Sequence, residues 1–246
     1  MDSDVLKQVN WMGRRIVDFL LPPLCPATGE PVDQHGMVHA AYWQGLNFIN
    51  DPICKTCGVP FSFEASDLEC GDCLENPPAY KKNRSSLIYD DGCRDLILRF
   101  KHGDQTHAVR AFIPWLNMAA TDIIKSTDII VPVPLHYYRL LKRRFNQAEL
   151  IARHFSRNYQ SISYYPDGLL RIRNTQSQGH KKPAERSKNV KKAFAVNPKY
   201  NYSGRSVLII DDVYTTGATL NECAAMLYSA GASEVNCLTL ARAVKN

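Results

Sequence analysis

The 246-residue sequence predicts an α/β fold, in which helices cover both faces of a mostly parallel sheet, joined to a small N-terminal domain. Two observations support this prediction. From Ser86 onward, apolar runs alternate with segments of helical periodicity, the pattern of a parallel sheet buried on both sides. Before that point, residues 22–83 are rich in Pro, Gly, Cys and polar residues and cannot bury a large core. We therefore divide the chain into an N-terminal domain, 1–84, and an α/β domain, 85–246.

Each element follows from its apolar pattern. Short apolar runs bounded by turn residues predict strands at 87–89, 128–132, 193–196, 207–210 and 235–240. Helical spacing predicts helices at 95–101, 108–124 and 220–227, and a long helix with one face formed by Leu141, Phe145, Ala148, Ala152 and Phe155. Near the N-terminus, the same spacing predicts an amphipathic helix through Val5, Val9, Met12, Ile16 and Leu20. The sequence shows no internal repeat.

Composition narrows the classes of protein to consider. The chain is 45% hydrophobic and 22% charged, as globular proteins are, and no apolar run approaches the roughly 18 residues of a membrane-spanning helix. Asp18 interrupts the apolar run that a secretory signal would need, so we expect a cytoplasmic protein. Thirty basic against 24 acidic residues give a net charge of +6, which suits phosphate or nucleic-acid ligands without requiring them.

Two Cys-x₂-Cys pairs lie in the N-terminal domain, Cys54 with Cys57 and Cys70 with Cys73. Four thiolates at this spacing can close a tetrahedral Zn²⁺ site, which would stabilise a domain that lacks a core. Two disulfides or a redox dithiol are the alternatives. The absence of a secretory signal and the matched pairs favour structural zinc. Three further cysteines have apolar neighbours and are expected in the core: Cys93, Cys223 and Cys237.

The most informative segment runs from Val207 to Thr219. A buried strand is expected to end in Asp211 and Asp212, and a turn then opens a helix with Thr215, Thr216, Gly217, Ala218 and Thr219. Backbone N–H groups and hydroxyls of such a turn can hold a phosphate, and the helix N-terminus adds partial positive charge. The two carboxylates suit the hydroxyls of a ribose. A Mg²⁺-binding acidic pair or a simple helix cap would also fit parts of this pattern.

A second strand end lies near Pro132. Two prolines stiffen the loop after it, at Pro132 and Pro134, and basic and amide residues follow at the expected start of the long helix: Arg139, Lys142, Arg143, Arg144, Asn146 and Gln147. This position suits a loop that binds a second phosphate group. A solvated basic face on an amphipathic helix is the alternative.

The segment from Val207 to Thr219 resembles the signature of type I phosphoribosyltransferases, which bind 5-phosphoribosyl 1-pyrophosphate (PRPP). Together with 95–102, 132–136, 144–149 and 171–194, it resembles the ComF family, in which a cysteine-rich N-terminal part precedes a phosphoribosyltransferase-type domain. That family is associated with DNA uptake in natural competence. The resemblance implies a zinc ribbon followed by a type I phosphoribosyltransferase-like sheet, and extends from about residue 52 to the C-terminus.

The resemblance also implies roles for residues. Asp211 and Asp212 would be the catalytic pair that binds the two hydroxyls of the ribose, and Thr215 to Thr219 would hold the 5′-phosphate of the ribose. The pyrophosphate loop would run from Val133 and Pro134 to Arg139, with Arg144 beyond it, and 173–189 would close over the site. Relatives carry a further zinc knuckle, whereas here Thr28 follows Cys25, and His39 and Tyr42 stand where another pair would lie. We therefore expect a single zinc.

Two functions from different classes follow. The first is Mg²⁺-assisted transfer of phosphoribose from PRPP to a nitrogenous acceptor, in a protein of DNA uptake. The second is a non-catalytic or regulatory protein of the same fold that binds single-stranded DNA through two clusters of basic residues, at 139–144 and 171–192. The retained carboxylate pair favours a PRPP- or nucleotide-binding site, because a protein that binds only DNA gains nothing from two carboxylates in a phosphate-binding turn.

Overall fold

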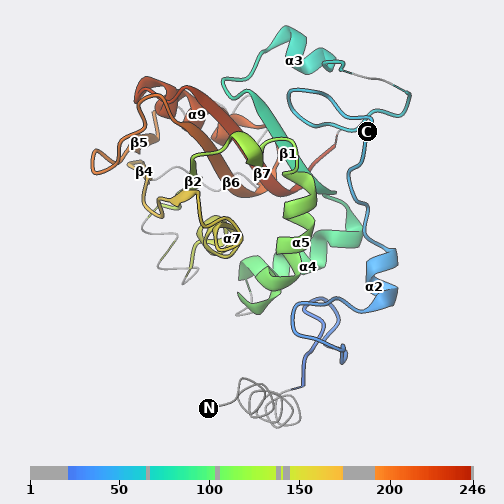
Figure 1. The fold of residues 1–246 in the computed structure, drawn as a ribbon. Coiled ribbons are helices and arrows are strands. Elements are labelled where there is room, and N and C mark those ends of the chain that lie inside the picture. The colour runs from blue at the N-terminus through green and yellow to red at the C-terminus, as the bar shows by residue number, and fades with distance from the viewer. Residues whose placement is uncertain are drawn as a thin grey trace, which may run out of the picture.

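The computed structural model describes residues 22–64, 67–102, 106–136, 140, 145–173 and 192–244. Its centre is a parallel sheet in the order β1-β7-β6-β2-β3 (Figure 1). The bounds of the five strands are Lys82–Ile88 for β1, Ile129–Pro132 for β2, Ser163–Tyr164 for β3, Ser206–Tyr214 for β6 and Glu234–Arg242 for β7. The predicted α/β class and parallel sheet are confirmed.

Both faces of the sheet are buried, as the apolar runs predicted. In β6, Val207 and Ile209 pack on one face while Leu208 and Ile210 pack on the other. Helices α4 (Asp91–His102), α5 (Val109–Ala119) and α7 (Gln147–Ser156) cover the second of these faces (Figure 1). Helix α9 (Ala218–Ser229) covers the first, beside an antiparallel pair of short strands, β4 (Leu169–Arg171) and β5 (Phe194–Val196).

Several element boundaries differ from those predicted. Strand β6 continues through the two carboxylates to Tyr214, because β7 keeps pairing with it along its whole length. Helix α7 begins only at Gln147, and β3 and β4 were missed because two or three residues are too few to show periodicity. Strand β1 begins at Lys82, so the proposed domain boundary after residue 84 falls inside it. The predicted N-terminal helix lies outside the described residues.

The three predicted core cysteines, Cys93, Cys223 and Cys237, are completely buried in the apolar interior. All eight cysteines are free thiols, which excludes the disulfide alternative in this structure. Two short 3-10 helices flank α5, at Thr106–Ala108 and Ile124–Ser126. None of the helices in the described part of the chain is long and apolar enough to cross a membrane.

The N-terminal region contains an internal repeat that the sequence analysis did not find. In the first copy, the Cys25 amide donates to Glu30 (2.7 Å), Gly29 to Cys25 (2.8 Å) and Val32 to Pro23 (2.9 Å). The same three backbone hydrogen bonds recur 29 positions later, at 2.8, 2.9 and 2.8 Å. The two turns also share four residue types at the same offset, since Pro23, Cys25, Gly29 and Pro31 correspond to Pro52, Cys54, Gly58 and Pro60.

Each turn is followed by a five-residue helix, α2 (Ala40–Gln44) after the first and α3 (Gly71–Glu75) after the second. The residues that begin these helices, His39 and Cys70, donate their amides at 3.3 Å to the sulfurs of Cys25 and Cys54. The chain therefore carries two ribbons of the same construction, which we call the first ribbon (23–45) and the second ribbon (52–76).

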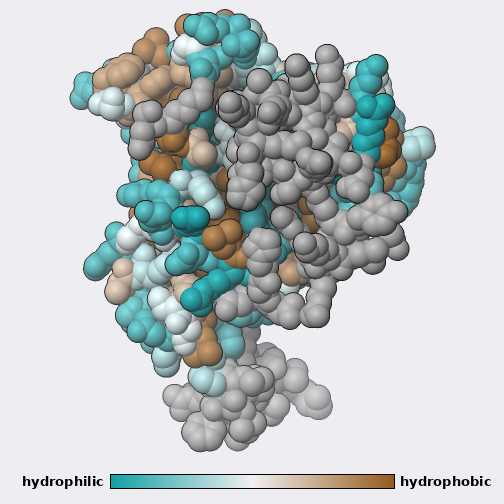
Figure 2. Space-filling model, turned by 180° about the vertical axis from the view of Figure 1, so that it is seen from behind, coloured by the Kyte–Doolittle hydropathy of each residue, from teal (hydrophilic) through white to brown (hydrophobic). Residues whose placement is uncertain are grey.

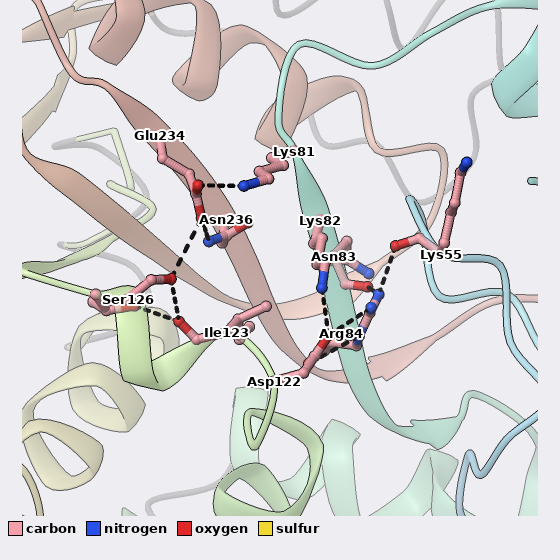
Figure 3. Close-up of polar contacts among 11 residues, drawn as sticks. Lys55, Lys81, Lys82, Asn83, Arg84, Asp122, Ile123, Ser126, Glu234 and Asn236 are labelled. Atoms are coloured by element: carbon pink, nitrogen blue, oxygen red, sulfur yellow. Dashed lines mark hydrogen bonds and ion pairs between the residues drawn. The ribbon is translucent and has the colours of Figure 1, made fainter. Parts of the chain in front are cut away.

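The second ribbon packs against the edge strand β1. Asn83 donates its amide to the Thr56 carbonyl at 2.7 Å, and the side chain of Asn83 donates to the Cys57 carbonyl at 3.1 Å. Arg84 donates to the Lys55 carbonyl at 3.2 Å while its other guanidinium nitrogens contact Asp122 (Figure 3). The ribbon is thus fixed to the sheet through its backbone carbonyls.

The second ribbon carries apolar side chains that are exposed in the described part of the structure. Hydrophobic residues gather at the upper left of Figure 2, where this ribbon lies. Its exposed large apolar side chains are Phe63, Leu68 and Leu74.

The repeat provides a matched pair of glycines for testing this packing. Gly29 and Gly58 have the same left-handed conformation, with φ of 78° and 70°, but only Gly58 faces a neighbour. A Cβ at Gly58 would lie 2.6 Å from the Asn83 carbonyl oxygen, whereas a Cβ at Gly29 meets nothing within 4 Å. We expect Gly29→Ala to lower the free energy of unfolding by about 1 kcal/mol and Gly58→Ala by about 2–4 kcal/mol in urea titrations. Equal losses would show that the ribbon does not pack closely on β1.

Candidate functional site

The two predicted carboxylates lie near the carboxyl end of β6, between β7 and the end of β2. Open parallel sheets bind ligands at this edge. Val133, the first residue after β2, donates its amide to the Ile210 carbonyl at 2.9 Å, which holds the predicted pyrophosphate loop beside the carboxylates. Asp211 accepts the amide hydrogen of Asp212 at 2.8 Å. The fold therefore brings the two predicted loops together at one edge.

Lys101, at the end of α4, is a further residue of this site. Its Nζ lies 3.0 Å from Oδ2 of Asp212, with only 19% of the lysine side chain and 15% of the aspartate side chain exposed. The sequence predicts a helix at 95–101 and a family resemblance over 95–102, but it indicates no role for Lys101. No local pattern could have found this pair, because the two residues are brought together by packing across the sheet.

The carboxylate pair is electrostatically strained. Burial raises the pKa of Asp211 from 3.8 to about 7, with the neighbouring Asp212 acting in the same direction. The amide of Asp212 and the charges of Lys101 and Arg171 oppose this rise. Arg171 ends β4, so a second basic side chain reaches the site from a strand that the sequence analysis missed. Ligand groups that donate hydrogen bonds or carry positive charge would relieve the strain.

Asn146 and Gln147, at the start of α7, position the surrounding elements. The Asn146 side chain accepts the amide of Ala148, which caps α7, and donates to the Val133 carbonyl at 2.9 Å. The Gln147 side chain is buried and donates to the Lys101 carbonyl at 3.1 Å. One dipeptide thus ties the loop after β2 and the end of α4 to the same helix. Both side chains therefore position neighbouring groups of the site.

The predicted phosphate-binding turn joins β6 to α9. Gly217 has φ of 71° and begins α9, and Thr216 accepts the amide of Ala218 at 3.5 Å. The first amides of a helix have no partner within it, so the 12-residue α9 that follows this left-handed residue can offer them to an anion. Thr215, Ala218 and Thr219 lie in the same turn or the first turn of α9.

The remaining predicted ligand residues are only partly described. Pro134 follows Val133 beside the carboxylates and is half-buried. Arg139, Arg144 and most of the predicted closing segment 173–189 lie outside the described residues, as do Lys142 and Arg143. Their assignments remain predictions.

The four predicted zinc ligands converge in the second ribbon. The sulfurs of Cys54, Cys57, Cys70 and Cys73 all lie within 4.8 Å of one another, and those of Cys57 and Cys70 are 3.6 Å apart. Sulfurs in a tetrahedral zinc site are separated by about 3.8 Å, as zinc–sulfur bonds of about 2.3 Å require. Among the described residues this is the one group of three or more candidate ligands. The geometry supports the structural zinc site.

The thiols are already arranged to bind metal. Burial raises the pKa of Cys54, but amides of Cys70 and Cys57 donate to its sulfur and bring the pKa down to about 7. Burial and the other thiols raise the pKa of Cys70 to about 11 and that of Cys73 well above its usual range. A divalent cation would remove this repulsion between thiolates, because it stabilises the deprotonated form of every ligand.

The first ribbon offers no such ligand set in the same positions. Cys25 corresponds to Cys54, while Thr28, His39 and Tyr42 replace the other three cysteines. The Tyr42 ring packs against the core of the α/β domain, and burial raises the pKa of its hydroxyl to about 12. The first ribbon is thus held by apolar packing where the second has four thiols.

Known proteins resemble both parts of the chain. Residues 16–74 match the family model described as double zinc ribbon domain, and residues 148–245 match the phosphoribosyl transferase domain. The chain is 33% identical over 198 residues to competence protein F of Haemophilus influenzae, covering 78% of this chain and 85% of that protein. It is 31% identical to DNA utilization protein YhgH of Escherichia coli K12 (77% and 84% covered) and to competence protein ComFC of Bacillus subtilis (80% of each).

The two ribbons predict the metal content. We expect one zinc per chain, although two ribbons are present, because only the second has four thiol ligands. Cys57→Ser should lose the zinc, whereas Cys25→Ser should retain it. Elemental analysis of the purified full-length protein measures both. Two zinc ions per chain, or loss of zinc in Cys25→Ser, would contradict the assignment.

The raised pKa of Asp211 predicts a pH dependence of stability. Between about pH 4 and pH 7 the folded protein holds a proton that the unfolded chain has released, so this group lowers stability as pH rises. We therefore expect Asp211→Asn to stabilise the protein, relative to wild type, more at about pH 8 than at about pH 5. Urea titrations at the two pH values test this.

Asp122 serves as the control for that experiment. Although burial opposes the shift, the hydrogen bonds of Arg84 and Lys82 lower its pKa, so the carboxylate is ionised at both pH values. Its stabilising contribution is lost only at lower pH, and Asp122→Asn should cost the same amount of stability at both. If Asp211→Asn behaves like Asp122→Asn, the carboxylate of Asp211 is not strained.

Proposed function

The chain belongs to the family of competence protein F, ComFC and YhgH, and we propose that it binds PRPP with Mg²⁺ at the carboxyl end of β6 and acts in the cytoplasm in DNA uptake. One observation carries the proposal of a ligand. A buried strand brings two adjacent carboxylates to the carboxyl edge of the sheet, a few residues before the left-handed glycine Gly217 that caps α9. Hydroxyl donors and a phosphate, separated by the length of a ribose, match these two features. The names of the relatives support the role in DNA uptake.

In this proposal, different residues bind different parts of PRPP. Asp211 and Asp212 accept the hydrogens of the two ribose hydroxyls, and the turn from Thr215 to Thr219 holds the 5′-phosphate. Val133 and Pro134 face the pyrophosphate. Lys101 neutralises Asp212 in the free site and supplies positive charge close to the polyanionic ligand. Binding would thus place hydroxyl donors on a carboxylate pair that burial has strained.

The described residues fit Mg²⁺ only if the ion binds together with the phosphate ligand. Mg²⁺ usually takes one or two carboxylates together with substrate phosphates and water, and Asp211 and Asp212 are the carboxylates available here. No group of three or more carboxylates converges among the described residues, so the ion would be held mainly by the pyrophosphate. Bound there, it would neutralise charge on the pyrophosphate.

The arrangement supports a transferase rather than a hydrolase with a protein nucleophile. An acceptor nitrogen forms a bond to C1 of the ribose as the bond from C1 to the pyrophosphate oxygen breaks. Pyrophosphate leaves with the electron pair, and the acceptor nitrogen releases a proton. The protein's residues bind and orient the two reactants, and an anionic pair beside the ribose stabilises positive charge developing on the sugar.

The alternative function, single-stranded DNA binding without catalysis, rests on basic residues that lie mostly outside the described ranges, including Lys181 and Lys182. The described part of the site contains a carboxylate pair instead, which repels a nucleic-acid backbone. The geometry therefore favours a small phosphorylated ribose ligand at this edge.

Asp212→Asn tests the ribose assignment. The substitution keeps the shape of the side chain, removes its charge and replaces an acceptor oxygen with a donor. Losing a charge-assisted hydrogen bond costs about 1.5–3 kcal/mol, so we expect PRPP to bind about ten- to a hundredfold more weakly. Thr216→Val should cause a comparable loss at the phosphate end. Calorimetric titration with PRPP and Mg²⁺ gives both affinities.

Asp128→Asn is a matched control in the same sheet. Asp128 precedes β2 at the opposite edge, where it accepts the Ser206 amide and pairs with Arg205. This variant should bind PRPP as the wild type does, with circular dichroism confirming that all three variants are folded. Equal PRPP affinity in wild type and Asp212→Asn would refute the ribose assignment, and absence of PRPP binding by the wild type would refute the ligand.

A further inference from the structure

Arg242, the last residue of β7, connects the second ribbon to the α/β domain. Its side chain is buried, with 5% exposed, and Nη1 donates a hydrogen bond to the carbonyl of the zinc-knuckle residue Cys57. The Arg242 guanidinium also lies over the ring of Tyr214, with Cζ 4.5 Å from the ring centroid. One cation therefore contacts the zinc knuckle and the last residue of the strand that carries the carboxylates.

Tyr214 in turn lies against the phosphate-binding turn. A Cβ at Gly217 would be 2.5 Å from the Tyr214 hydroxyl oxygen and 2.8 Å from its Cζ, so the ring fills the space beside the glycine. The Tyr214 hydroxyl is 3.0 Å from that of Tyr80, a buried residue in the link between the second ribbon and β1. In the same link, the Ala79 amide donates to Asn221 in α9. Two routes thus join the ribbon to the start of α9.

Among the described residues, no carboxylate forms an ion pair with Arg242. Its Nε is buried without a hydrogen-bond partner among the same residues. A buried unpaired guanidinium is costly. A zinc ion bound by four thiolates carries two net negative charges, since four negative charges outweigh its two positive ones. The metal-loaded second ribbon therefore supplies the missing negative charge beside Cys57.

We propose that Arg242 and Tyr214 are positioning residues that couple the zinc knuckle to the phosphate-binding turn, so that zinc holds the turn ready for its ligand. This inference rests on the proposed function for the identity of the ligand. With zinc bound, Arg242 is held between the Cys57 carbonyl and the Tyr214 ring, and the ring fixes the backbone at Gly217. Without zinc, the guanidinium loses its counterion and the ring loses its support.

Such coupling must act in both directions. If zinc strengthens PRPP binding by some factor, PRPP must strengthen zinc binding by the same factor, and couplings of this kind typically amount to roughly 5- to 150-fold. A zinc site that only stabilised the fold locally would not respond to a ligand of the distant turn. Ligand-dependent retention of zinc therefore distinguishes coupling from a purely structural role.

Arg242→Met tests the connection in the full-length, zinc-loaded protein. Methionine keeps an apolar side chain but removes the charge and the hydrogen bond to Cys57. We expect zinc to remain at one per chain, PRPP to bind about tenfold more weakly in calorimetric titrations with Mg²⁺, and PRPP to lose its ability to slow zinc removal by a chelator. Tyr214→Leu should have the same effects, and the double variant should be no worse than either single one.

Arg84→Met is the matched control. Arg84 is also a buried arginine that donates to a ribbon carbonyl, that of Lys55, but it pairs with Asp122 and does not touch the turn (Figure 3). This variant should lose stability while PRPP affinity and the effect of PRPP on zinc retention stay as in wild type. If Arg84→Met and Arg242→Met weaken PRPP binding equally, loosening of the ribbon explains both and the coupling is wrong.

Hydrogen exchange separates this inference from the proposed function. In ligand-free protein, the amides of residues 215–219 should exchange about tenfold faster in Arg242→Met than in wild type or Arg84→Met. If wild type binds no PRPP, the proposed ligand is wrong, and the exchange comparison still decides whether the ribbon holds the turn. Unchanged exchange in a folded Arg242→Met would overturn the inference.

Discussion

Two adjacent carboxylates near the end of a buried strand impose the main constraint on this structure. Removing Asp211 from water is costly, and the neighbouring Asp212 adds to the cost of ionising it. The surrounding elements offset part of this free-energy cost. Helix α4 ends where Lys101 reaches Asp212, and Gln147 holds the carbonyl of that lysine. Helix α7 begins where its capping Asn146 also fixes the loop after β2. The end of α4 and the start of α7 are therefore both positioned around this pair of carboxylates.

The N-terminal region shows two ways to stabilise one backbone turn. In the first ribbon, Cys25 and its neighbours join the main core, and an aromatic cluster of Trp43, Phe48 and Trp115 covers the junction. In the second ribbon, the buried residues form a separate cluster that consists of three of the cysteines themselves. Packing can replace the metal in the first ribbon because the α/β domain lies against it. The second ribbon has no apolar core of its own, so its stability depends on the metal.

Sequence reasoning succeeded where the signal is local. The apolar run before Asp211 predicted a buried strand, and the Cys-x₂-Cys spacing predicted four sulfurs that the structure places within 4.8 Å of one another. It failed where pairing or packing decides the outcome. Strand β6 continues past Ile210 because β7 pairs with it as far as Tyr214, although the two aspartates in that stretch disfavour a strand. The repeat of the two ribbons was missed although Pro, Cys, Gly and Pro recur at the same spacing, because Thr28 breaks the Cys-x₂-Cys motif in the first copy.

The sequence by itself determined the main strands and helices of the α/β domain, the four sulfur ligands, and the acidic pair with its glycine-containing turn, because apolar period, ligand spacing and turn chemistry act over a few residues. The tertiary structure decided which distant groups meet these motifs. Lys101 reaches Asp212, Arg171 acts on Asp211, and Arg242 lies between the zinc knuckle and Tyr214 only because the sheet and its helices bring those positions together. Their partners depend on strand order and helix packing, which are set by the burial of the whole core and not by any local pattern.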